Sequence, residues 1–260
     1  MYHYVEYSHK YQKKRPCASS KSSLAPPAAP RRSPTPSPRA GKTIDLADPE
    51  KDFSTCAVDE DDQVLIALPS FGGRVPTIAT ERLSRIAGNG AACTLICVYG
   101  NRAFEDTLAE MEDTARACGF NVVAAVAAVA EHSIFPQFAT GRPDAADAAQ
   151  LRGFARHIVE EATDTPTIPG NRPYKQGGRG SLVPQPTGTC VGCGLCAREC
   201  PAQAIDAGGY AADPETCIGC MRCPRICPVN AREVNAAAVA AKAEVLSPAC
   251  TPRKENELFL

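Results

Sequence analysis

The chain has 260 residues, of which 44% are hydrophobic, and its formal net charge at pH 7 is −1. This length allows one medium-sized domain and a small one, and the near-neutral charge argues against the concentrated basic surface that nucleic-acid binding requires. No uninterrupted apolar run is long enough to cross a bilayer, and residues 1–14 lack the basic and then apolar order of a signal peptide. We therefore expect a cytoplasmic protein that binds no nucleic acid and does not insert into a membrane.

The first 42 residues carry little of the pattern of a folded domain. Residues 2–8 read as a first strand, whereas residues 10–42 are crowded with Pro, Ser, Arg and Lys and follow neither a helical nor a strand period. This composition predicts a disordered segment. Its basic residues would suit a polyanion-binding arm, but the Pro and Ser content favours a solvated tail.

Residues 43–162 alternate between apolar strands and helical stretches. The strands are expected over residues 43–46, 63–68, 93–99 and 121–129, and the helices over residues 78–86, 104–118 and 144–162. This alternation favours an α/β domain with a doubly wound parallel sheet and helices on both faces. Residues 163–186, rich in Pro and Gly, predict a linker that is long enough to wrap against a domain.

Eight of the fourteen cysteines form two runs of identical spacing, C-x2-C-x2-C-x3-C-P. Three thiolates in a tight loop can face three corners of an iron–sulfur cubane, and glycines at positions 192, 194 and 219 ease the loop. The repeat predicts a small α+β domain over residues 187–235, followed by a tail over residues 236–260. A pair of four-cysteine zinc sites is the alternative, but zinc requires neither the third cysteine nor the proline after the fourth. We expect the other six cysteines to be structural or incidental.

The spacing is that of bacterial dicluster ferredoxins, in which the fourth cysteine of each run binds the other run's cluster. The resemblance implies two 4Fe-4S clusters with crossed ligand sets. The first cluster would be held by Cys190, Cys193, Cys196 and Cys227. The second would be held by Cys217, Cys220, Cys223 and Cys200. Ile205 and Val229 are expected to supply apolar cover for these sites.

Residues 69–76, 99–102 and 130–134 directly follow predicted strands, where open α/β sheets bind their ligands. Together with the cysteine repeat, these segments resemble the flavodoxin–ferredoxin fusion family, in which a flavodoxin-like domain precedes a bacterial-type dicluster ferredoxin. The resemblance implies an FMN site whose isoalloxazine ring is flanked by Phe71, Gly72, Tyr99, Gly100 and Asn101. Tight turns with a packed aromatic side chain are the alternative interpretation. His132 is expected to be structural rather than catalytic.

The sequence departs from that family where a flavodoxin holds the flavin phosphate, because no Ser/Thr/Gly/Asn loop follows the first strand. The codons compatible with residues 9–13, read from the second base, allow Thr-Asn-Thr-Lys, which resembles such a loop. We therefore hypothesise that residues 10–41 are a frameshifted stretch. If the stretch is real, the first helix is absent, one face of the sheet stays uncovered, and most of the affinity for flavin is lost.

These features favour an electron carrier that binds two 4Fe-4S clusters and shuttles low-potential electrons to or from a redox protein partner, in anaerobic metabolism. One alternative is an FMN-dependent reductase that is supplied with electrons by its own clusters. Another is a flavin-free docking subunit of a larger oxidoreductase. No pairing of a nucleophile with a base indicates a substrate of the chain's own.

Overall fold

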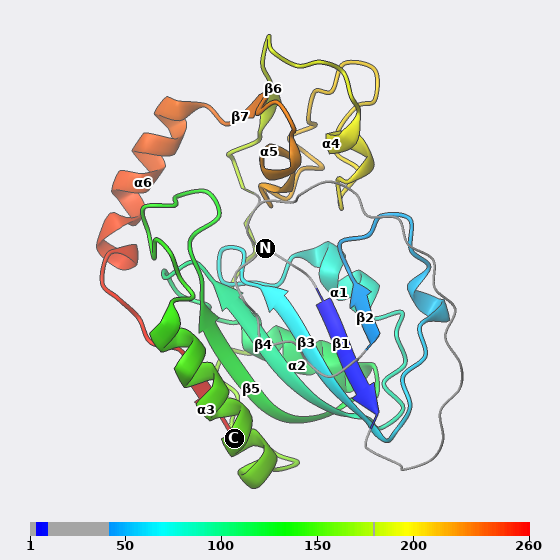
Figure 1. Ribbon diagram of the computed structural model, residues 1–260. Helices are drawn as coiled ribbons and strands as arrows, with labels where there is room; N and C mark the ends of the chain where they lie inside the picture. The colour runs from blue at the N-terminus through cyan, green and yellow to red at the C-terminus, as the bar shows by residue number, and fades with distance from the viewer. Residues whose placement is uncertain (1–3, 10–41, 179) are drawn as a thin grey trace.

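The computed structural model describes residues 4–9, 42–178 and 180–260. The frameshift hypothesised for residues 10–41 falls outside these ranges, as does the disorder predicted for residues 10–42, except that Lys42 is the first residue of a strand. An α/β domain forms the lower part of the molecule, and a small cysteine-rich module, residues 185–233, lies above it (Figure 1). The parallel strands of the sheet point with their carboxyl ends toward the module.

A six-stranded sheet is the centre of the α/β domain, with the strand order β2-β1-β3-β4-β5-β8. Its strands are β1 (Tyr4–His9), β2 (Lys42–Asp45), β3 (Asp62–Pro69), β4 (Ala92–Tyr99), β5 (Asn121–Val129) and β8 (Glu257–Phe259). The order of the first five is that of flavodoxin-like sheets. However, only β3, β4 and β5 are mutually parallel neighbours, because β1 runs antiparallel to β2 and β3, and β8 runs antiparallel to β5. The α/β class is confirmed, whereas the prediction of a wholly parallel sheet is wrong at β1 and β8.

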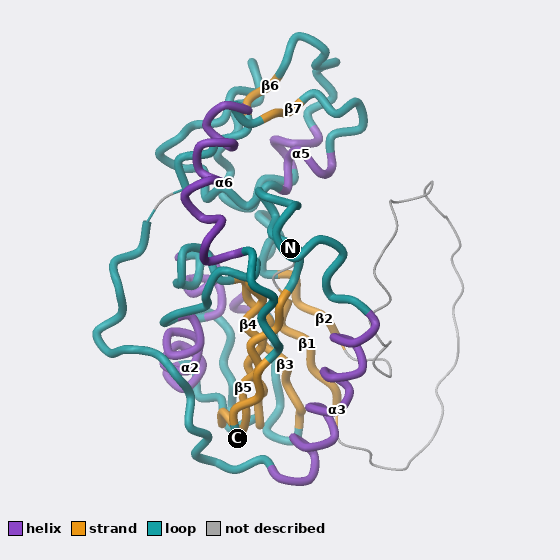
Figure 2. The backbone as a smooth tube through the Cα atoms, turned by 90° about the vertical axis from the view of Figure 1, so that its left-hand side faces the viewer, coloured by secondary structure: helices purple, strands orange, loops and turns teal. Residues whose placement is uncertain are grey.

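Helices cover both faces of this sheet, as the alternating pattern predicts. Helices α1 (Thr77–Leu83) and α2 (Thr107–Ala117) lie on one face and α3 (Ala145–Glu161) on the other (Figures 1 and 2). A single 3-10 turn, Phe53–Thr55, lies between β2 and β3. On α2 the apolar positions Leu108, Met111 and Ala115 are completely buried. Gly119, two residues after the end of the helix, has a φ of 83°, the left-handed conformation expected there.

The two faces of β3 differ in how well they are covered. Val64 and Ile66 point into the core beneath α1 and α2 and are buried, whereas Leu65, on the opposite face, is 39% exposed. Helix α3 lies on that opposite face but packs against β5 at the far side of the sheet. Among the described residues, therefore, no helix packs over this part of the sheet face.

The predicted linker wraps against α2. Asp106, the N-cap residue of α2, accepts hydrogen bonds from the backbone N–H groups of Asn171 and Lys175 at 2.8 and 2.7 Å. Arg172 pairs with Asp113 on the same helix at 2.8 Å. These contacts place the segment between α3 and the module along the outer surface of α2, so the chain reaches the module without crossing the sheet.

The sequence predicts only a tail over residues 236–260, but this segment folds. Helix α6 (Ala236–Cys250) descends from the module, and β8 then joins the edge of the sheet beside β5 (Figure 1). Asn256, which is 3% exposed, accepts a hydrogen bond from the N–H of Val129 at 2.8 Å and donates to Gln150 on α3 at 2.7 Å. The chain therefore leaves the α/β domain, forms the module and returns.

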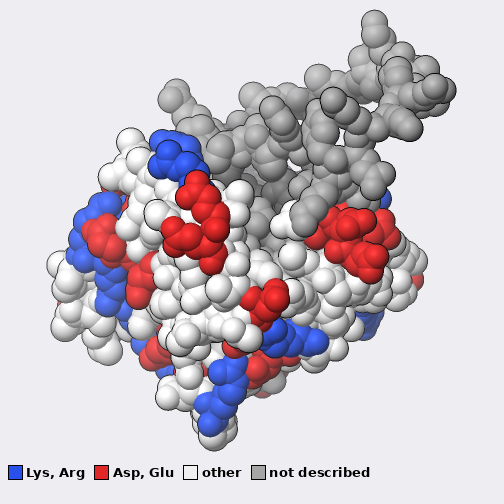
Figure 3. All heavy atoms as spheres, turned by 90° about the horizontal axis from the view of Figure 1, so that it is seen from below, with Lys and Arg blue, Asp and Glu red and all other residues white. Residues whose placement is uncertain are grey.

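The module itself contains only short elements. They are β6 (Gln185–Pro186), α4 (Leu195–Arg198), α5 (Arg222–Ile226) and β7 (Arg232–Glu233), with β6 and β7 paired antiparallel. Within the residues that the structure describes, no helix is long and apolar enough to cross a bilayer. Seen from below, on the side opposite the module, Lys and Arg side chains lie among Asp and Glu side chains (Figure 3). This face therefore presents charges of both signs.

The C-terminal segment contacts a buried ion pair between Arg142 and Asp147, whose side chains are 3% and 0% exposed. Arg142 donates to the carbonyl of Lys254, and Asp147 accepts a hydrogen bond from Asn256. Asp147→Asn should lower the free energy of unfolding by about 3 kcal/mol, because it leaves a buried guanidinium without its counterion. Urea denaturation at pH 7 measures this loss. Glu161→Gln, an equally conservative change at the exposed end of α3, is the control and should cost less than about 0.5 kcal/mol.

Arg142 holds the pKa of the Asp147 carboxyl well below its ordinary value of 3.8, chiefly through hydrogen bonds. The stabilisation is therefore fully present above that ordinary pKa and is lost as the pH falls toward the lower pKa of the folded state. The difference between wild type and Asp147→Asn should shrink only below about pH 4. An equal loss in Asp147→Asn and Glu161→Gln would show that the ion pair contributes nothing.

Candidate iron–sulfur centre

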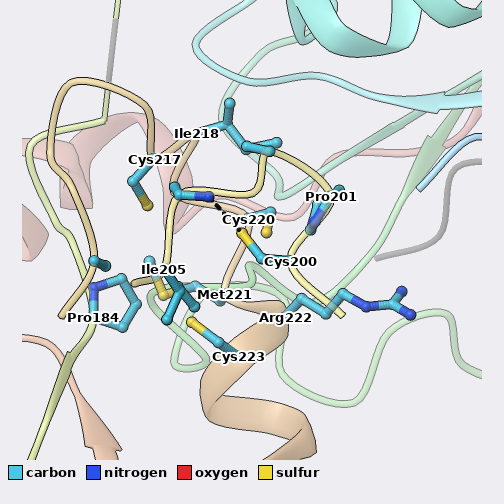
Figure 4. Close-up of a pocket in the computed structure, with 13 residues that line it drawn as sticks. Pro184, Cys200, Pro201, Ile205, Cys217, Ile218, Cys220, Met221, Arg222 and Cys223 are labelled. Carbon is cyan, nitrogen blue, oxygen red and sulfur yellow. Dashed lines mark hydrogen bonds between the residues drawn. The ribbon is translucent and has the colours of Figure 1, made fainter. Parts of the chain in front are cut away.

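The eight cysteines of the repeat line two cavities in the module. An inner cavity is lined by Cys200, Cys217, Cys220 and Cys223 (Figure 4). An outer cavity is lined by Cys190, Cys193, Cys196 and Cys227. Each cavity combines three cysteines of one run with the fourth cysteine of the other, which is the grouping that the sequence predicts.

The two cysteine loops have the same backbone conformation, in keeping with the repeat in their sequences. Gly192 and Gly219, which each precede the second cysteine, have φ values of 69° and 65°, and Gly194 and Met221, which each follow it, have φ values of 73° and 57°. Glycine adopts this left-handed region without strain, whereas a residue with a Cβ atom pays roughly 1–2 kcal/mol there. Met221 is 5% exposed and lines the inner cavity, so its side chain supplies apolar cover that a glycine would not.

Backbone N–H groups point at several of the cysteine sulfur atoms. The N–H of Ala204 donates to Cys200 Sγ at 3.3 Å, and the N–H of Ala231 donates to Cys227 Sγ at 3.2 Å. The fourth cysteine of each run therefore accepts the same hydrogen bond, from the N–H four residues later. The N–H of Gly219 donates to Cys217 Sγ at 3.4 Å. Such donors stabilise the thiolate form that binds metal.

The surroundings of the inner cavity are apolar. Ile205, Ile218 and Met221 line it together with prolines 184 and 201 (Figure 4). Burial raises the pKa of the Cys223 thiol to about 11, and the charge of Arg232 and a hydrogen bond from it oppose this rise. Free thiols of this kind are protonated at neutral pH, so binding of metal must release protons. Of the two residues expected to supply apolar cover, Ile205 lines the inner cavity and Val229 the outer one.

The residues present fit an iron–sulfur cluster. Each cavity offers four thiols and no His, Asp or Glu side chain in its lining, and soft thiolate ligands select iron–sulfur clusters or zinc. The thiols are distributed around a cavity, and among the described residues no three His, Cys, Asp or Glu side chains are placed to hold one metal ion. Four sulfurs around a space, with N–H donors behind them, suit a cubane.

The two cavities differ in their exposure. Cys190 and Cys193 of the outer cavity are exposed, and beside them Val191 and Val229 are 65% and 43% exposed. None of the four inner cysteines is exposed, and Pro201 in the lining of the inner cavity accepts a hydrogen bond from Arg82 of the α/β domain. The outer cavity is therefore the one that another molecule can approach closely.

Comparison with known proteins agrees with this geometry. Residues 189–231 match a family model described as a 4Fe-4S dicluster domain. No curated protein and no solved structure gives a match to the chain. The module is thus a 4Fe-4S dicluster domain with an iron–sulfur electron-transfer role, and the ferredoxin part of the resemblance is confirmed. No family match covers the α/β domain.

The residues expected to flank a flavin are engaged in packing. Tyr99 is 2% exposed, and its ring packs edge-on against Phe104 with 5.4 Å between the ring centroids. Asn101, also 2% exposed, donates to the carbonyls of Cys250 and Pro252 at 2.6 and 2.9 Å and accepts from the N–H of Lys254 at 3.2 Å. The C-terminal segment therefore occupies both polar atoms of the Asn101 side chain.

The other positions of the expected flavin site form tight turns. Phe71 and Arg74 are bridged through their backbones, which places Gly72, with a φ of 65°, in the turn between them. A Cβ atom on Gly100 would lie 2.7 Å from the ring of His132, so no space remains above this glycine. The loop that would hold the flavin phosphate falls outside the described residues. Phe71 and Gly72 therefore lie in a tight turn, whereas Tyr99, Gly100 and Asn101 lie in packed surroundings.

His132 has the structural role expected for it. Its Nδ1 accepts hydrogen bonds from the N–H groups of Ile134 and Phe135 at 3.2 and 3.4 Å, and its ring packs against Phe135. Burial lowers the pKa of His132 to about 4, so the imidazole is neutral at physiological pH. It organises the loop after β5.

Arg82 joins the module to the α/β domain. Its guanidinium donates to the carbonyl of Leu46 at 2.7 Å and to the carbonyl of Pro201, directly after Cys200, at 2.8 Å. Sequence reasoning did not single out Arg82, because a lone arginine on a helix gives no signal of a carbonyl 119 residues away. The inner cavity is thus anchored to the end of β2 and to α1.

Arg82→Met should loosen the module at the inner cavity. Hydrogen bonds from a charged donor contribute about 1.5 kcal/mol or more each, so amide exchange over residues 202–205 of the cluster-loaded protein should accelerate about tenfold. Hydrogen–deuterium exchange with mass spectrometry measures the rate. Arg85→Met, on the exposed end of the same segment, is the matched control and should leave this rate unchanged. The same rate in both variants would contradict the anchoring role.

Proposed function

We propose that this protein is an electron carrier that holds one 4Fe-4S cluster in each cavity and passes low-potential single electrons to or from a redox protein partner. The observation that carries the proposal is the crossed grouping of the eight cysteines around two cavities. Each cluster, when bound, supplies the capacity to take up and release one electron at a time. The family match over residues 189–231 supports the same function.

In this proposal the cluster ligands are those that line the cavities. Cys190, Cys193, Cys196 and Cys227 hold the outer cluster. Cys217, Cys220, Cys223 and Cys200 hold the inner cluster. The chain itself contributes the N–H donors of Ala204, Gly219 and Ala231, which stabilise the negative charge on the sulfurs. It also contributes the apolar side chains around each cavity, which limit the access of water to the cluster.

The partner exchanges electrons with the outer cluster. Cys190 and Cys193 are the exposed ligands, and Val191 and Val229 provide a small apolar surface beside them, which suits a brief protein contact. The inner cluster faces the α/β domain, where Arg82 fixes the chain after Cys200. Clusters of low potential with exposed ligands are lost to oxygen, so the proposal places the protein in anaerobic metabolism.

The crossed ligand sets are tested by serine variants of single cysteines. Cys200→Ser should leave about four irons per chain, and the electron paramagnetic resonance spectrum of its reduced form should match that of Cys217→Ser. It should differ from the spectrum of Cys190→Ser, although Cys190 is in the same run as Cys200. Cys56→Ala, outside the module, is the control and should keep about eight irons. A Cys200→Ser spectrum matching that of Cys190→Ser would refute the crossing.

A second proposal concerns the α/β domain, which we infer to be a flavin-free scaffold for the module and its partner. The observation that favours it is the use of Asn101 by the C-terminal segment, together with the burial of Tyr99. The alternative of an FMN-dependent reductase requires these groups to be available to a ring.

Protein purified and reconstituted without oxygen should therefore contain less than about 0.1 flavin per chain. Titration with FMN at micromolar concentration should produce no quenching of flavin fluorescence and no shift of the flavin absorbance bands. The measurement is made on the full chain, with a known flavodoxin as the positive control. Flavin present in a one-to-one ratio with the chain would contradict the scaffold proposal and support the reductase.

A further inference from the structure

Arg232 occupies a position at which the two halves of the repeat differ in chemistry. It is the fifth residue after Cys227, and the corresponding residue after Cys200 is Ile205. Both side chains are buried, with Arg232 4% and Ile205 8% exposed. The repeat thus places an apolar side chain at the inner cavity and a permanent positive charge at the same position beside the outer cavity.

The contacts of Arg232 leave its charge without a carboxylate. Nη1 donates to the carbonyl of Tyr210 at 2.7 Å and to Cys196 Sγ at 3.6 Å, and Nη2 donates to the carbonyl of Pro184 at 2.7 Å. Nε is buried and has no hydrogen-bond partner among the described residues. Over the same residues, no Asp or Glu forms an ion pair with Arg232, whereas Arg222 at the inner cavity pairs with Glu199 at 2.6 Å.

A buried guanidinium without a counterion is strongly destabilising, so an anion next to Arg232 would stabilise the folded protein. Arg232 itself lines the outer cavity, and its charge also acts on Cys223 of the inner set. A cluster with four thiolate ligands is anionic and becomes more so when it is reduced. A cluster bound in the outer cavity would therefore supply the negative charge that Arg232 lacks.

We propose that Arg232 tunes the clusters electrostatically, raising the reduction potential of the outer cluster above that of the inner cluster, so that the outer cluster is reduced first. This inference rests on the proposed function, in that both cavities must hold clusters. One electron from an external reductant, a redox protein or dithionite, reduces one cluster and makes its net charge more negative by one. No covalent bond forms or breaks, and no proton moves, because arginine stays protonated.

The physical reason is that a cation and a hydrogen-bond donor both stabilise the reduced, more negative state more than the oxidised one. The outer cluster receives the larger effect because Arg232 lines its cavity and donates to its ligand Cys196. At the inner cavity the equivalent residue, Ile205, supplies neither a charge nor a donor.

The test is a redox titration of the cluster-loaded full chain, followed by electron paramagnetic resonance. The two reduction steps are first assigned in wild type by finding which step remains in Cys217→Ser, which keeps only the outer cluster. Wild type should reduce the outer cluster first. In Arg232→Gln the equilibrium constant for reduction of the outer cluster should fall at least about tenfold, which corresponds to about 59 mV for one electron. The inner cluster should shift by less.

Two further variants separate charge from structure. Arg232→Lys retains the charge and should keep the outer equilibrium constant within about threefold of wild type, although it loses carbonyl contacts. Arg225→Gln removes the same charge from an exposed position on α5 and should change the constant less than about twofold, because solvent screens it.

Equal shifts in Arg232→Lys and Arg232→Gln would overturn the inference, as would equal shifts in Arg232→Gln and Arg225→Gln. If the Arg232 variants do not retain clusters, the wild-type titration decides, because reduction of the inner cluster first, or of both together, also overturns it. Failure of the proposed function would give a different result, because the wild-type protein would then contain fewer than about eight irons per chain.

Discussion

The exchange of fourth cysteines between the two halves of the repeat is the constraint on which the module depends. Cys200 lies in the cavity of the second run and Cys227 in the cavity of the first, so neither half can complete its site alone. A module this small has few buried apolar side chains of its own. Its folding is therefore tied to what the cavities bind, and each half holds the other in place.

The α/β domain holds this module from two sides. Arg82 fixes the chain just after Cys200, and the linker on α2 and the descending helix α6 connect the module to opposite parts of the domain. The C-terminal segment then contacts Asn101 and joins the sheet through β8. Open α/β sheets commonly bind ligands at their carboxyl edge, and here the C-terminal segment binds the Asn101 side chain after β4 and the N–H of Val129 at the end of β5.

The sequence predicted what depends on local pattern and missed what depends on distant contacts. The buried face of α2, with Leu108 and Met111, follows from helical spacing, and the cysteine grouping follows from a repeated motif. Strand β8 is three residues long, too short for a periodic signal, and its place beside β5 depends on Asn256. The structural use of Asn101 depends on partners about 150 residues away. Arg232 was not singled out from the sequence, because its burial and its carbonyl partners at Tyr210 and Pro184 depend on the fold.

The central claim is that the two cavities hold 4Fe-4S clusters, and metal analysis of the full chain tests it most directly. Iron and acid-labile sulfide are measured on protein reconstituted without oxygen, and electron paramagnetic resonance is recorded after reduction. The account predicts about eight irons and eight sulfides per chain, with the broadened spectrum of two interacting reduced clusters. Two zinc ions per chain with no sulfide, or a single isolated cluster, would contradict it.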